Sequence, residues 1–186
     1  MSSPTADVSV RVAWADDAPA VARCQVAAWR EQYADVLPQE MVDSLDVDDF
    51  ARKWAASMDK PGDARNRVLV ALERATVRGF AVTSPADDPD ADPIADGEIV
   101  EFVIDAAAHG EGHGSRLLQA CTDTLRADKF TRATWWIAST DDRLRSFVEG
   151  TGWAPDGAHR ELDVDGTGAN TIKQVRLHTS LVVDDD

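Results

Sequence analysis

One stretch of the chain, residues 98–125, constrains the fold more than any other. It begins with Glu-Ile-Val-Glu-Phe-Val-Ile-Asp, a β-branched and aromatic run that predicts a buried strand. The segment Ala-Ala-Ala-His-Gly-Glu-Gly-His-Gly-Ser follows, and apolar residues then recur at steps of three and four, as in a helix. The stretch therefore predicts a strand, a glycine-rich turn and a helix in direct succession.

The turn has the composition of an anion-binding loop. Gly110, Gly112 and Gly114 let the backbone approach a bound molecule closely, and the free amides at the start of a helix point at any anion placed there. The glycine spacing matches neither of the common nucleotide-binding patterns, G-x-x-x-x-G-K-S/T and G-x-G-x-x-G. An anion site and a purely structural tight turn therefore remain as two interpretations of the loop.

Length and composition favour one globular domain. The chain has 186 residues and is 44% hydrophobic, which suits a single domain over residues 8–181. We expect residues 1–7 to form a disordered tail and residues 182–186 an acidic tail. No apolar run approaches a membrane span and the N-terminus lacks a signal-peptide layout, so we expect a cytoplasmic protein. Cys24 and Cys121 fall on apolar helical positions, which favours buried reduced thiols.

The net charge of −15 is the largest compositional deviation. It argues against nucleic-acid binding, because no basic stripe is present to release counterions from a phosphate backbone. One interpretation is a solvated acidic surface that tolerates high salt. A second, compatible interpretation is a field that attracts a cationic substrate.

The patterns along the chain predict an α/β (α+β) domain whose mixed, mostly antiparallel sheet is flanked by helices. The segment 85–96 holds three prolines and five aspartates and is expected to be a mobile surface decoration. The predicted order is strand, helix, helix, three strands, helix, strand, helix and two strands. The strands are expected at 8–14, 67–73, 77–84, 98–105, 132–139, 159–164 and 171–181, and the helices at 16–37, 46–58, 116–125 and 141–149.

Three residues of the first predicted helix, Trp29, Tyr33 and Leu37, recur every four positions and so share one face. Core packing explains Trp29 well. Tyr33 is the one tyrosine of the chain, and its polar tip suits the wall of a pocket. We take Trp29 and Tyr33 as candidate substrate-binding residues.

The order of elements, the loop His-Gly-Glu-Gly-His-Gly at 109–114 and the segments 143–147 and 151–153 together resemble the GNAT superfamily of acyl-CoA-dependent N-acetyltransferases. The likeness covers residues 8–181. It implies that the amides of the glycine loop hold the pyrophosphate of acetyl-CoA, the co-substrate. It also implies that the preceding strand pairs with the pantetheine as if with another strand. The cofactor-binding residues implied are Val103, Ile104, His109, Gly110, Glu111, Gly112, His113, Gly114, Ser115, Arg143 and Phe147.

The resemblance also implies where the acid–base chemistry lies. Glu98 falls where several family members hold a carboxylate general base, and Glu101 is a second candidate. The two lie on opposite faces of a regular strand unless a bulge intervenes. A buried carboxylate with a raised pKa would suit the role.

The sequence departs from the family pattern at two positions. His109 replaces the usual Arg or Gln, which makes cofactor binding weaker and pH-dependent. Val148 stands where the family usually supplies a tyrosine acid. The proton for the departing thiolate would then come from Ser139, Ser146, a water or Tyr33, unless catalysis has been lost.

The resulting expectation is an N-acetyltransferase that moves an acetyl group from acetyl-CoA to a primary amine of a small molecule or peptide. Alternatives are a non-catalytic acyl-CoA-binding or regulatory domain and an enzyme acting on protein N-termini or lysines. The four histidines show no zinc-site spacing, so we predict no metal. We expect neither nucleic acid nor membrane as a partner, and the resemblance allows a homodimer.

Overall fold

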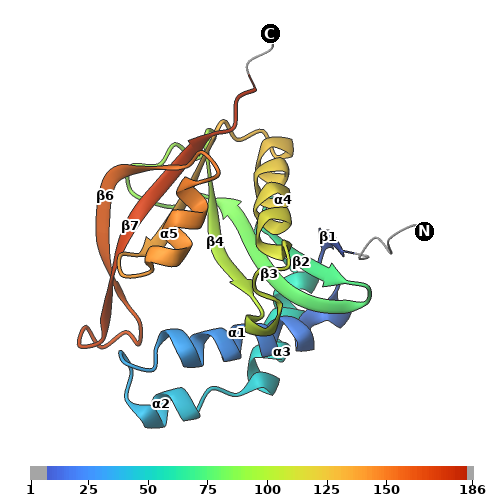
Figure 1. The fold of residues 1–186 in the computed structure, drawn as a ribbon, viewed down its shortest axis with the longest axis vertical. Helices are drawn as coiled ribbons and strands as arrows, with labels where there is room; N and C mark the ends of the chain where they lie inside the picture. The colour runs from blue at the N-terminus through green and yellow to red at the C-terminus, as the bar shows by residue number, and fades with distance from the viewer. Residues whose placement is uncertain (1–7, 184–186) are drawn as a thin grey trace.

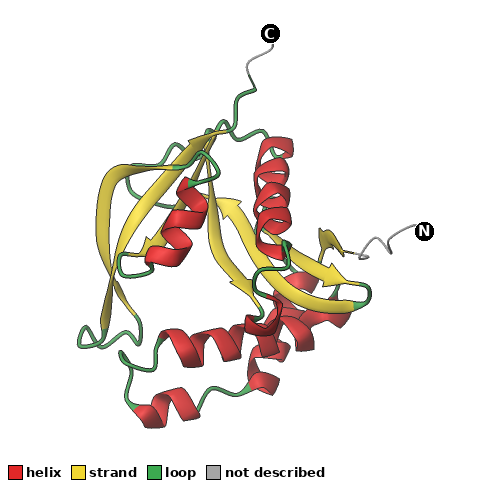
Figure 2. Cartoon of the chain, in the orientation of Figure 1, coloured by secondary structure: helices red, strands yellow, loops and turns green. Residues whose placement is uncertain are grey.

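The computed structural model describes residues 8–183, in which seven strands form one sheet flanked by helices (Figures 1 and 2). The predicted tail at 1–7 and residues 184–186 of the predicted acidic tail lie outside the described residues. The strands are β1 (Val8–Val12), β2 (Arg67–Glu73), β3 (Thr76–Pro85), β4 (Asp96–Ile104), β5 (Arg132–Ala138), β6 (Ala154–Asp163) and β7 (Thr171–Ser180). The helices are α1 (Ala18–Gln32), α2 (Gln39–Asp43), α3 (Val47–Asp59), α4 (His113–Ala127) and α5 (Asp142–Glu149), with short 3-10 helices η1 (Ala15–Asp17) and η2 (Ala106–Ala108).

The sheet is mixed but mostly antiparallel, which confirms the predicted fold class. Its strand order is β1-β2-β3-β4-β5-β7-β6, and the one parallel pair among these strands is β4 with β5. That pair is parallel because α4 crosses over between the two strands. The predicted hairpin of β2 and β3 is also confirmed.

Helix α4 packs on one face of the sheet and buries the larger core. Its residues Leu117, Leu118, Cys121 and Leu125 are almost completely buried, as the predicted three and four residue steps require. They contact the inward face of β2 to β5, where Ile99 lies. Helix α4 begins directly after the glycine-rich loop, so its packing on the sheet also fixes β4 relative to that loop.

The other face of the sheet is covered by α1 and α3, which lie together below β3 and β4 in Figure 1. Val21 of α1 packs against Phe80 and Val103 of those strands, and Trp54 of α3 packs beside them. Side chains along β2 therefore alternate between two cores, which explains why Leu69, Val70, Ala71 and Leu72 are all buried. None of the helices in the described part is long and apolar enough to cross a membrane.

The first predicted helix was too long. Helix α1 ends at Gln32, and Leu37 lies in a turn in which its amide donates to the carbonyl of Tyr33. The backbone leaves helical geometry at Tyr33, the C-cap, whose φ is −104° and ψ is 7°, whereas Pro38 restricts only Leu37. A short helix that the patterns did not predict, α2, then begins after Pro38.

The segment 85–96 is tied to the sheet, contrary to the expected mobile decoration. Arg176 of β7 donates to Asp90 at 2.7 and 2.8 Å and to Asp88 at 3.3 Å. The indole of Trp136 donates to Asp88 at 3.0 Å. The acidic composition that looked typical of a solvated loop supplies acceptors for a buried arginine, which no local pattern could show.

Gly79 of β3 should be intolerant of a side chain. A Cβ there would lie 2.5 Å from the carbonyl oxygen of Val103 and 2.8 Å from Ile104. We expect Gly79→Ala to lower the free energy of unfolding by about 1–3 kcal/mol, because the backbone of β4 would have to shift. Urea denaturation measures the change.

The matched control is Gly62→Ala, since a Cβ at Gly62 would meet nothing within 4 Å. It should change stability by less than about 0.5 kcal/mol. Equal effects of the two substitutions would contradict the close packing of β3 on β4.

Candidate active site

The site begins where β4 and β5 part. The parallel pairing runs from Asp96 opposite Arg132 to Ile99 opposite Trp135 and goes no further. Beyond that point β4 continues to Ile104, paired on its β3 side only. The backbone of residues 101–104 is therefore open on one edge, and an exposed edge can pair with an extended ligand.

A β-bulge lies at the parting point. Glu101 pairs with Val82 and Ile99 with Thr83, so Val100 has no partner on β3. The extra residue reverses the alternation of side chains. Glu98 and Glu101, three positions apart, therefore lie on the same face of the sheet, the face covered by α1. The sequence left open whether the two carboxylates share a face of the strand, and the bulge places them on the same face.

The glycine loop joins the end of β4 to α4. Gly110 and Gly112 have φ values of 81° and 85°, in the left-handed region that glycine adopts without strain. The backbone amides of Gly110, Glu111 and Gly112 donate no hydrogen bond to any described residue. Together with the free amides of the first turn of α4 they form a polar concave surface suited to phosphate groups.

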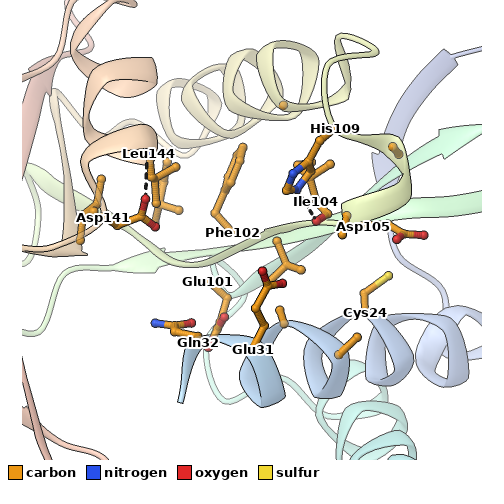
Figure 3. Close-up of a pocket in the computed structure, with 18 of the residues that line it drawn as sticks. Cys24, Glu31, Gln32, Glu101, Phe102, Ile104, Asp105, His109, Asp141 and Leu144 are labelled. Carbon is orange, nitrogen blue, oxygen red and sulfur yellow. Dashed lines mark hydrogen bonds between the residues drawn. The ribbon is translucent and has the colours of Figure 1, made fainter. Parts of the chain in front are cut away.

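Two further elements border this loop. Phe147 of α5 approaches it closely, since a Cβ on Gly114 would lie 3.6 Å from the Phe147 ring. Arg143, also on α5, is exposed and lines the same cleft. The His109 ring turns back to β4, where its Nε2 lies 3.0 Å from the carbonyl oxygen of Ile104 (Figure 3).

All these groups face one cleft of about 1660 Å³. It runs from the glycine loop, past the open edge of β4, to the far strands β6 and β7. Of the predicted site residues, Glu98, Glu101, Val103, Ile104, His109, Gly110, Gly112, Gly114, Ser115, Arg143, Phe147 and Tyr33 line it, whereas Glu111, His113 and Trp29 do not.

Glu98 is the most deeply placed carboxylate of the cleft. It is 7% exposed and makes no hydrogen bond or ion pair with any described residue. Burial, and then the negative charges of Asp88 and Asp87, raise its pKa to about 7, although Arg160 and Arg176 act in the opposite direction. The segment 85–96 thus acts on the site, and the sequence offered no signal for this.

Glu101 has a different environment. Burial raises its pKa to about 7, and the side chain of Trp29 acts in the opposite direction. Trp29 packs edge-on against Tyr33 and Phe50 and does not line the cleft.

Tyr33 is the candidate acid that reaches the cleft. It is largely buried, and burial together with the charge of Glu101 raises its pKa to about 12, so it stays protonated. Neither Ser139 nor Ser146 lines the cleft. Val148, which stands where the family usually has tyrosine, is fully buried in the core beneath α5.

One group of residues in the described part could hold a cation. Ligand atoms of Glu73, Glu111 and His113 lie within 4.8 Å of one another. Arg78 already donates to Glu73 at 2.9 Å, so the set is partly neutralised without an ion. The absence of a metal stays a prediction.

Comparisons with known proteins bear on the family and the fold of the chain. A model described as the acetyltransferase (GNAT) family matches residues 26–153. The uncharacterized N-acetyltransferase YuaI of Bacillus subtilis (strain 168) is 25% identical over 130 residues, which are 70% of this chain and 71% of YuaI. An N-acetyltransferase from Staphylococcus aureus Mu50 shares the fold with a TM-score of 0.73 at 16% identity. The match covers 95% of this chain and 99% of the Staphylococcus aureus chain. For yncA from Salmonella typhimurium, solved with acetyl-CoA, the TM-score is 0.71 at 18% identity over 97% of each chain.

The chain belongs to the acetyltransferase (GNAT) family, because the family model spans more than half of its length. It is therefore an acetyltransferase, and the non-catalytic alternative is no longer needed.

The buried charge of Glu98 should cost stability in a pH-dependent way. Its pKa is higher in the folded chain than the ordinary 4.5, so folding favours the protonated form. The cost of ionising it appears as pH rises above 4.5 and is complete above about 7. We expect Glu98→Gln to be more stable than wild type by up to about 3 kcal/mol at pH 8.5 and by much less at pH 5.

Urea denaturation of both proteins at the two pH values tests this. The exposed Glu161, replaced by Gln, is the control and should change the free energy of unfolding by less than about 0.5 kcal/mol. A stability difference for Glu98→Gln that is the same at pH 5 and pH 8.5 would contradict the buried, unpaired carboxylate.

Proposed function

We propose that this chain transfers the acetyl group of acetyl-CoA to a primary amine of a small molecule or peptide, with Glu98 as general base. The observation that carries the proposal is the buried, unpaired Glu98 beside the point where β4 and β5 part. The presence of acetyl-CoA in the similarly folded yncA supports the choice of acyl donor.

The chain offers three contacts for coenzyme A. The free amides of residues 110–115 suit the pyrophosphate, and the guanidinium of Arg143 adds a positive charge beside them. The open edge of β4 at Val103 and Ile104 suits the amides of the pantetheine. The third contact is Phe147, whose ring packs beside Gly114 and lines the cleft at the loop.

Acetyl-CoA supplies the thioester whose carbonyl carbon the amine attacks. An alkylammonium must first lose a proton, and Glu98 is placed to accept it directly or through a water. The amine lone pair then forms the C–N bond while the C–S bond breaks with its electron pair on sulfur. Of the three protons of the ammonium, one stays on the amide, one is released to solvent, and one equivalent is returned to sulfur.

We assign the delivery of a proton to the thiolate sulfur to Tyr33. It is the phenol that lines the cleft, and its raised pKa keeps the proton available at neutral pH. The negative charge of Glu101 contributes to the raised pKa of Tyr33, so the phenol still carries its proton when the C–S bond breaks.

The pH dependence of kcat should report Glu98. Activity should rise through about pH 7 as the carboxylate ionises. Glu98→Gln should lower kcat by a factor of about 10² to 10⁴ and abolish the inflection. Asp88→Asn should move the inflection to lower pH, because the negative charge of Asp88 raises the pKa of Glu98. The rate of thiol release from acetyl-CoA, followed as a function of pH, measures kcat for the wild type and for both variants.

Tyr33→Phe is the companion variant and should lower kcat without moving the inflection. Because Asp88 acts on Glu98 and not on Glu101, its effect identifies which carboxylate titrates. Near wild-type kcat for Glu98→Gln, or an inflection that moves to higher pH in Asp88→Asn, would contradict the proposal.

A further inference from the structure

The side of the cleft away from the glycine loop carries several negative charges. Glu98 and Glu101 of β4 face α1, and Glu31 at the end of α1 lines the same space. In Figure 3 Glu31 rises from α1 toward the strand that carries Glu101, with Gln32 beside it. Phe102, on the opposite face of β4, points toward α4 and α5 instead.

These carboxylates lack cationic partners of their own. Neither Glu31 nor Glu98 is hydrogen-bonded or ion-paired to any residue between 8 and 183, and Glu98 is more than nine-tenths buried while lining the cleft. Arg160, which also lines the cleft, donates to Gln174 at 2.8 Å, stacks 4.3 Å over Trp136 and lies 3.7 Å from Asp88. Its direct contacts are therefore with these residues and not with Glu98.

The spacing of the two strand carboxylates is set by the bulge. Successive residues on one face of a strand are about 7 Å apart. With Val100 bulged out, Glu98 and Glu101 become such neighbours. That spacing resembles the separation of the two nitrogens of a short aliphatic diamine.

We propose that the acetyl acceptor is a short aliphatic diamine bound as a dication, with the reacting nitrogen at Glu98 and the second ammonium between Glu101 and Glu31. The ring of Tyr33 borders the same space and can stabilise a cation. The inference rests on the proposed function and adds the class of acceptor. The product keeps one ammonium, so it loses one of its two charge contacts, and this favours its release.

A matched pair of acceptors tests the proposal. Putrescine (1,4-diaminobutane) and butylamine share a four-carbon chain and differ in the second amine. We expect kcat/KM for the diamine to exceed that for butylamine by about tenfold or more at constant ionic strength. Glu31→Gln and Glu101→Gln should each reduce that ratio severalfold toward one.

Glu161→Gln is the control for the general field of the protein. It removes the same charge from β6, next to the cleft residues Arg160 and Leu162, but does not line the cleft. It should keep the wild-type ratio. A ratio that falls equally in Glu161→Gln and Glu31→Gln would overturn the specific contact.

The outcomes separate this inference from the function on which it rests. Equal efficiency with both amines overturns the diamine assignment and leaves the acetyltransferase proposal standing. A short alanine-terminated peptide acetylated more efficiently than the diamine also overturns the assignment, in favour of a peptide acceptor. Failure to release thiol with every amine, although coenzyme A binds in calorimetry, overturns both.

Discussion

The parting of β4 from β5 is the constraint on which the site depends. The two strands pair in parallel up to Ile99 and Trp135, and the core packed beneath α4 holds both strands rigidly in that position. Past this point the twist of the sheet separates them and leaves one edge of β4 unpaired. The glycine loop, the bulge and the carboxylates all lie within a few residues of that edge, so the fold places cofactor contacts and acid–base groups together.

Burying carboxylates in the site costs electrostatic free energy, and the proposed chemistry depends on that burial. Glu98 is buried and Glu101 half-buried, neither has an arginine partner, and the chain as a whole is strongly negative. The neighbouring acidic segment 85–96 is neutralised instead, by Arg176, which also binds Asp156 at 2.6 Å. Burial and the charges of Asp88 and Asp87 outweigh the opposite effect of Arg160 and Arg176, so the pKa of Glu98 stays high, which suits a base that works near neutral pH.

Local signals made much of the fold predictable. The periodicity of the apolar residues, clearest over 98–125, predicted the elements and their order. Asp46 and Asp141, at which two of the predicted helices begin, are N-caps in the structure, where their carboxylates accept amides of the next helix. The bulge at Val100 and the link between Asp88 and Arg176 were not predictable, because both depend on partners far along the chain. The same holds for the early end of α1. Candidate site residues could thus be named from the sequence, whereas the face of the sheet on which Glu98 and Glu101 lie could not.

Amide hydrogen exchange with and without coenzyme A tests most directly whether the open edge of β4 and the glycine loop form the cofactor site. The account predicts slower exchange in residues 101–104 and 110–115 when coenzyme A is bound, with little change in β1, β2 or α3. Binding seen in calorimetry, with protection confined to other segments, would contradict it.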